Sequence, residues 1–154
     1  MTTRIARTSA GLLLALMSGL ITLNAFAGDD EATGPSLYER LGAQEGLSQI
    51  VNDTIALHHK NPEIAHYFEG VDDDQLAGHV VAFFAAGTGG PADYQGRDMV
   101  STHASMQLSE ADFDSAAADV LKAVEANGVD AKSKAEVAAI LESLRPAVIG
   151  TTES

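Results

Sequence analysis

The sequence contains no cysteine and no tryptophan, and aromatic residues make up only 5% of its 154 residues. Without cysteine the chain can form no disulfide and no thiolate metal site, and it has no cysteine nucleophile. The scarcity of aromatic rings leaves no stacking platform for single-stranded nucleic acid. Any metal or ligand must therefore be held by side chains other than thiolates.

Lysine and arginine are also scarce, with nine of them against 22 aspartates and glutamates, so the formal net charge is -13 at pH 7. Polyanions repel such a chain, which argues against charge-driven binding of nucleic acid or of an anionic membrane. There is no phosphate loop, no HExxH pattern and no Ser-His-Asp arrangement. The Gly-rich segment 87–91 lacks the phosphate-loop lysine and is interpreted as a helix breaker. Because no catalytic motif is present, enzymatic activity stays an open question.

The sequence has one long hydrophobic run, at residues 11–23. Arg4 and Arg7 precede it, and the small-x-small sequence at 25–27 follows it. This order is typical of an export signal, so we predict that residues 1–27 are removed and that the protein reaches the bacterial periplasm without a membrane attachment. The alternative is a retained anchor, because the run is close to the minimum for a membrane span. The short run and the cleavage site favour export.

The rest of the chain predicts one all-α domain at residues 36–150, preceded by a flexible lead-in at residues 28–35. No period-2 strand pattern is present, and helix-favouring residues dominate. Cap residues and Gly/Pro breaks divide the domain into helices and one short turn. The expected helices cover about 37–42, 44–60, 73–86, 98–106, 110–126 and 132–149, and the turn covers 64–70, with Pro146 disrupting the end of the last helix.

Two histidines stand out because each lies in an apolar stripe at helical spacing. His79 lies between Leu76 and Phe83 in one expected helix, and His103 shares the inner face of the next with Met99. A buried imidazole needs a partner for its nitrogen lone pair. That partner can be a metal ion or a group of the protein itself, and the spacing alone does not decide between them.

Four segments together resemble the group I truncated haemoglobins. They are SLYERLG at 36–42, NPEIAHYFEG at 61–70, LAGHVVAFF at 76–84 and GGPADYQGRDMVSTH at 89–103. Each segment is short, but their order and spacing are specific, and the resemblance extends from Ser36 to about Ile149. It implies a two-over-two helical sandwich that encloses a haem.

The resemblance also assigns roles to particular residues. It places the proximal iron ligand on His103, and Met99 is expected in the core or against the haem. Since there is no cysteine for a thioether bond, the haem would be haem b, bound non-covalently. Further haem contacts fall on Phe68 of the turn, on Leu76, His79, Val80 and Phe84 of the distal helix, and on Tyr94 and Arg97 near the propionates.

The distal side departs from the family pattern. Ile55 stands where many members have a tyrosine, and Val80 stands where glutamine is common, so we expect an apolar pocket in which Thr54 or a displaced His79 is the remaining donor. Some cyanobacterial and algal relatives bind iron through a histidine at the position of His79, which makes it a candidate sixth ligand. The alternative is that His79 points outward to a propionate. The remaining histidines, His58, His59 and His66, are expected at the surface.

These residues predict an exported haem protein that binds oxygen, nitric oxide or carbon monoxide at the iron. We hypothesise that long-lived oxygen storage is not its main role, because bound oxygen needs a hydrogen-bond donor. Electron transfer or nitric oxide dioxygenase-like chemistry would fit, but each requires a redox partner that the sequence does not reveal. The alternative is a haem-free helical binding or interaction module on a globin scaffold, an option that the missing distal tyrosine and glutamine keep open.

Overall fold

The computed structural model describes residues 34–91 and 93–150, and these residues form helices and connecting turns without a strand. The predicted export signal and residues 28–33 of the lead-in lie outside the described residues. Within the described part, no helix is both long and apolar enough to cross a membrane. The elements are α1 (Leu37–Arg40), α2 (Ala43–Lys60), η1 (Ala65–Phe68), α3 (Asp73–Gly87), α4 (Met99–His103), α5 (Glu110–Ala126) and α6 (Ala131–Ile149).

The helices begin where the sequence supplies a cap. The Ser36 side chain accepts from the backbone N–H of Glu39, whose carboxylate accepts from the backbone N–H of Ser36. Ser109 and Asp112 form the same reciprocal pair at α5. Such caps satisfy backbone donors that the first helical turn leaves without partners. The predicted all-α class and the predicted order of helices are confirmed.

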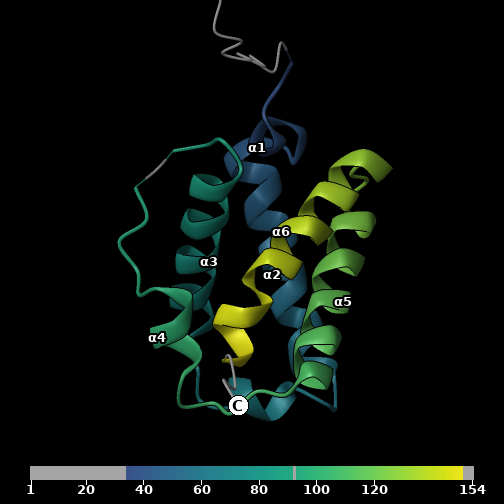
Figure 1. Cartoon of the computed structure of the whole chain (residues 1–154). Coiled ribbons are helices and arrows are strands. Elements are labelled where there is room, and N and C mark those ends of the chain that lie inside the picture. The colour runs from purple at the N-terminus through teal and green to yellow at the C-terminus, as the bar shows by residue number, and fades with distance from the viewer. Residues whose placement is uncertain (1–33, 92, 151–154) are drawn as a thin grey trace, which may run out of the picture. The chain divides into compact units, whose positions relative to one another are not determined.

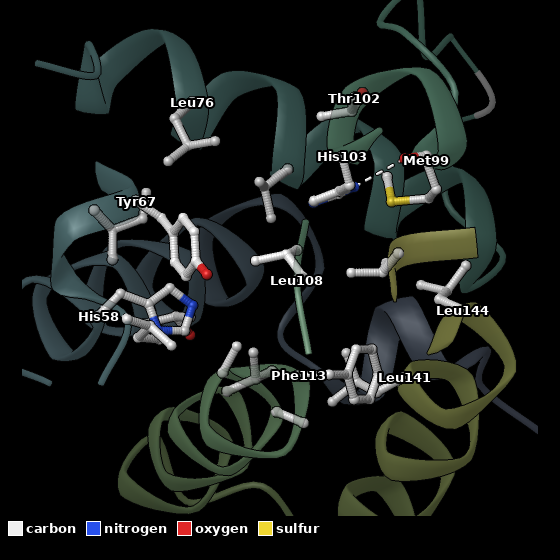
Figure 2. Close-up of a pocket in the computed structure, with 18 of the residues that line it drawn as sticks. His58, Tyr67, Leu76, Met99, Thr102, His103, Leu108, Phe113, Leu141 and Leu144 are labelled. Carbon is white, nitrogen blue, oxygen red and sulfur yellow. Dashed lines mark hydrogen bonds between the residues drawn. The ribbon is translucent and has the colours of Figure 1, made fainter. Parts of the chain in front are cut away.

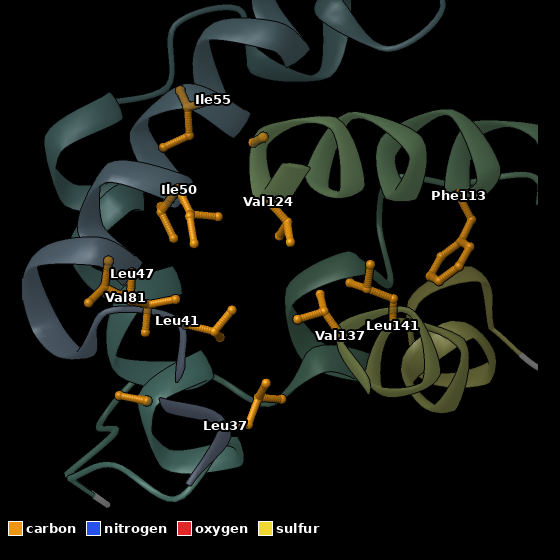
Figure 3. Close-up of a cluster of buried hydrophobic side chains, with 13 residues drawn as sticks. Leu37, Leu41, Leu47, Ile50, Ile55, Val81, Phe113, Val124, Val137 and Leu141 are labelled. Atoms are coloured by element: carbon orange, nitrogen blue, oxygen red, sulfur yellow. The ribbon is translucent and has the colours of Figure 1, made fainter. Parts of the chain in front are cut away.

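The helices form two pairs, α2 with α3 and α5 with α6, and α2 also packs against α5 (Figure 1). This is the predicted two-over-two arrangement. Buried aliphatic side chains from both pairs meet in one core, with Leu47 and Ile50 of α2 facing Val124 of α5 and Val137 of α6 (Figure 3). The short α4 lies beside α6, at the end of a long connection from α3.

Helix α3 has two apolar faces. Val81 and Ala85 are its buried residues and join the core with α2. Leu76, Val80 and Phe84, which the resemblance placed against a haem, line a cavity together with Phe83, and all four are partly exposed. Periodicity alone does not separate the two faces, since an apolar stripe looks the same whether it packs in a core or lines a cavity.

The end of α6 also differs from the expectation. Pro146 lies inside the helix, which continues to Ile149. A proline removes the hydrogen bond to the residue four positions earlier, here Glu142. Both residues are exposed, so water can satisfy the carbonyl that loses its donor.

The corner between α1 and α2 has two consecutive residues with left-handed backbone, Gly42 at φ 88 and Ala43 at φ 52. The first is a glycine, but the second is an alanine, for which this conformation costs roughly 1–2 kcal/mol. Both positions of this corner therefore favour glycine.

We therefore expect Ala43→Gly to raise the free energy of unfolding by about 0.5–1 kcal/mol, because the relief of strain exceeds the added chain entropy. Gly42→Ala should lower it by more than about 1 kcal/mol, because its Cβ would lie 2.9 Å from the Cα of Gly46. Urea unfolding of the three proteins measures both changes. A destabilising effect of Ala43→Gly would contradict the strain assigned to this corner.

Candidate functional site

A cavity of about 290 Å³ lies between α3 and the other helices, and apolar side chains form most of its wall. Leu76 of α3, Leu108 before α5 and Leu144 of α6 face into it (Figure 2). Every helix except α1 contributes to the lining, as does η1. The cavity therefore exists only when both helix pairs are assembled.

His103 is the last residue of α4 and is directed into this cavity (Figure 2). Its Nδ1 lies 2.9 Å from the carbonyl oxygen of Met99. A carbonyl can only accept, so Nδ1 carries the proton and Nε2 keeps its lone pair. Ligating histidines are oriented in this way in metal sites.

His79 lines the same cavity from α3, but its side chain is exposed. It therefore lies at the rim, where the cavity meets solvent. The structure thus brings both histidines of the predicted site to one cavity, with His103 in its wall and His79 at its opening.

Of the nine residues expected at the cofactor, seven line the cavity and two do not. Tyr94 and Arg97 lie in the connection before α4, where the Tyr94 hydroxyl donates to the Arg97 carbonyl at 2.7 Å. The ring of Tyr94 packs edge-to-face on Phe83, with 5.4 Å between centroids. Tyr94 thus adjoins the cavity wall from outside, and Arg97 is joined to Tyr94. The seven lining residues are Phe68, Leu76, His79, Val80, Phe84, Met99 and His103.

His58 was predicted at the surface, and the structure shows that this is wrong. Its side chain is buried, with 8% of the residue exposed, and it lines the cavity. The ring stacks on Phe68 with 5.0 Å between centroids. Its spacing from Val51 and Ile55 on the apolar stripe of α2 was the signal that could have placed it inside.

Asp119 of α5 is the partner of His58, with 3.3 Å between Asp119 Oδ2 and His58 Nδ1. This carboxylate is 2% exposed and also accepts from Asn61 Nδ2 at 2.7 Å and from Lys122 Nζ at 3.1 Å. Burial alone would raise the pKa of Asp119, but the hydrogen bonds from Asn61, Lys122 and His58 together hold it below its usual value. Burial lowers the pKa of His58, against the opposing effect of Asp119. At neutral pH the pair is therefore a neutral imidazole beside a carboxylate.

Tyr67 of η1 brings a second polar group to the cavity. Its hydroxyl lies 3.3 Å from Oδ2 of Asp112, the carboxylate that caps α5. Burial, with Asp112 nearby, raises the pKa of Tyr67, so the phenol stays protonated and donates. The expectation that Thr54 and His79 alone supply polarity was therefore incomplete. Thr54 itself donates to the carbonyl of Ile50 at 2.8 Å.

Comparison with known proteins gives one family and a consistent group of structures. The family model described as bacterial-like globin matches residues 36–149. A group 1 truncated haemoglobin of Nostoc sp. (strain MUN 8820) is 32% identical over 97 residues, which cover 63% of this chain and 82% of that protein.

Two solved structures show the same fold. Truncated haemoglobin from Tetrahymena pyriformis in its Fe(III) form has a TM-score of 0.73 and 24% identity, covering 76% of this chain and 100% of that one. The 2/2 haemoglobin of Synechococcus sp. PCC 7002, in the cyanomet state with covalently attached haem, has a TM-score of 0.71 and 22% identity over the same shares.

The lowered pKa of His58 predicts a pH dependence of folding stability. The unfolded chain binds this proton more readily, so the contribution of His58 is complete above its usual pKa of 6.5 and is lost as the pH falls through the lower folded value. We expect the free energy of unfolding to fall more steeply below pH 6.5 in the wild type than in His58→Phe.

His66→Phe is the matched control, because it removes an imidazole that is exposed rather than buried. Denaturant unfolding at a series of pH values measures all three slopes. Equal slopes in the wild type and His58→Phe would refute the burial of this imidazole.

Proposed function

This chain belongs to the bacterial-like globins and, among them, to the group 1 truncated haemoglobins, and from that premise we propose that it is a b-type haem protein that binds a diatomic gas at the iron. One observation carries the proposal: His103 is directed into an apolar cavity, and the Met99 carbonyl accepts from its Nδ1–H, so Nε2 is the nitrogen left to bind a metal. Iron supplies the coordination position for the gas when haem is bound.

The residues around the cavity fit a haem. Phe68, Leu76 and Phe84 offer apolar surface to a porphyrin. Arg97, whose guanidinium donates to the Ser101 carbonyl of α4, is proposed with Tyr94 for the propionates. Non-covalent attachment is proposed because the chain has no cysteine. The Synechococcus neighbour carries a covalently attached haem, so the mode of attachment belongs in the test.

His79 is proposed as the sixth ligand. It lines the same cavity as His103 and, being exposed at the rim, has room to turn inward. Two neutral imidazoles on the iron would give a low-spin resting state, whereas an outward His79 would leave an open position. A redox role, such as nitric oxide dioxygenase-like chemistry, would further require an external electron donor.

Absorption spectra of the purified protein with added haem, oxidised and then reduced, test this site. We expect a saturable Soret band, with split low-spin bands after reduction. His79→Ala should keep the haem but become high-spin, whereas His103→Ala should lose most of the haem affinity because the proximal ligand is gone. Acidified butanone should extract the haem completely.

His66→Ala serves as the control, because His66 is exposed and outside the cavity lining, and its spectrum should match the wild type. The absence of any saturable spectrum would overturn the haem proposal. It would favour the haem-free interaction module instead.

Export to the periplasm is a separate proposal, supported by the sequence of residues 1–27 alone. In a Gram-negative host, the mass of protein released by osmotic shock should correspond to a chain that begins at Gly28. Ala27→Arg should block cleavage, because the site requires small residues. Recovery of the uncleaved wild-type chain in the membrane fraction would instead support the anchor.

A further inference from the structure

We propose that the cavity wall inside the His79 rim presents hydrogen-bond acceptors and no free donors, and that His58, positioned by Asp119, makes the cavity retain small ligands that carry a hydrogen, such as hydrogen sulfide, for longer. The inference rests on the proposed haem binding and adds hydrogen-bearing ligands to the diatomic gases proposed for that site.

One polar hydrogen of the cavity wall belongs to the imidazole of His58. Asp119 accepts from Asn61 and Lys122 and lies 3.3 Å from His58 Nδ1, and an ionised carboxylate can only accept. The ring proton of neutral His58 is therefore on Nδ1, and Nε2 holds a lone pair. Asp119 thus acts as a positioning residue that sets the tautomer.

Nε2 of His58 faces the cavity. Among the described residues, Nε2 of His58 has no hydrogen-bond partner. Every side-chain nitrogen or oxygen there that is completely buried does have a partner, so Nε2 is not completely buried. His58 is itself buried and lines the cavity, so Nε2 opens into the cavity. Figure 2 shows His58 and Tyr67 on one side of the cavity and His103 on the other.

The hydrogens of the hydroxyl groups in the wall are also engaged in hydrogen bonds within the protein. Tyr67 donates to the Asp112 carboxylate at 3.3 Å. Thr54 donates to the Ile50 carbonyl, and Thr102 to the Asp98 carbonyl, each at 2.8 Å. With these hydrogens engaged, each hydroxyl oxygen offers the cavity only lone pairs. Apart from His79 at the exposed rim, the polar side chains that line the cavity can accept hydrogen bonds from a ligand but have no free hydrogen to donate.

This polarity is opposite to a distal tyrosine or glutamine, which donates to bound oxygen. Oxygen, nitric oxide and carbon monoxide carry no hydrogen and gain nothing from an acceptor. A ligand with an S–H or O–H bond can donate to Nε2 of His58, and a single hydrogen bond of this kind is worth about 0.5–1.5 kcal/mol net. The cavity should therefore retain such ligands longer.

The tautomer can be tested without any haem. In ¹⁵N ring spectra of the protein as purified before haem addition, the signals lost in His58→Phe identify His58 and should show the Nδ1–H form. Asp119→Asn should shift the population toward Nε2–H, because an amide can donate to Nδ1. A wild-type His58 in the Nε2–H form would overturn the inference.

Ligand preference is measured on the ferric, haem-loaded protein, with hydrogen sulfide as the donating probe and nitric oxide as the probe without hydrogen. The His79→Ala background removes competition from that imidazole. His58→Phe should raise the dissociation rate of hydrogen sulfide about twofold to twelvefold and should leave that of nitric oxide nearly unchanged. His59→Phe, the adjacent exposed histidine outside the cavity lining, should change neither rate.

Equal changes for the two gases, or no change for hydrogen sulfide, would overturn the proposed selectivity while leaving haem binding intact. If the protein takes up no haem, the proposed function fails, and the ligand preference fails with it. A normal haem spectrum together with an Nε2–H His58 overturns the present inference alone.

Discussion

Helix α2 is the element on which the other helices depend, because it packs against α1, η1, α3 and α5. Its buried stripe begins with Leu47 and Ile50 in the core and ends with His58 in the cavity wall. The same helix therefore stabilises the assembly at one end and supplies a polar group to the cavity at the other. Displacing α2 would disrupt both helix pairs at once.

Apolar side chains that line the cavity are not available to fill the core. Leu76, Val80 and Phe84 face the cavity and are partly exposed, so they contribute less burial than core residues do. Val81 and Ala85 on the other face of α3 make up part of that loss by packing on α2. The helix is thus held by one face, and the other remains available to a ligand.

Two arginine side chains of this acidic chain connect one helix to another through hydrogen bonds and ion pairs. Arg40 joins α1 to α6 through Ser133 and Glu136. Arg145 of α6 contacts Glu110 and Asp114 of α5, and its guanidinium lies 4.2 Å from the centroid of the Phe113 ring. Such partly exposed pairs add little energy individually, but they orient α6, which lines the cavity. Lys122 is used differently, since it helps Asp119 stay charged beside His58.

The sequence by itself determined the helices, because caps and breaks act within a few residues, as Ser36 with Glu39 and Gly42 show. Its resemblance to the truncated haemoglobins also indicated His103 and His79, and the structure brings both to one cavity. Only the tertiary structure showed that Val81 and Ala85 of α3 pack in the core, because the stripe that meets the core and the stripe that meets the cavity have the same periodicity. It also decided the role of His58, whose partner Asp119 is 61 residues away and whose contact exists only when α2 packs on α5.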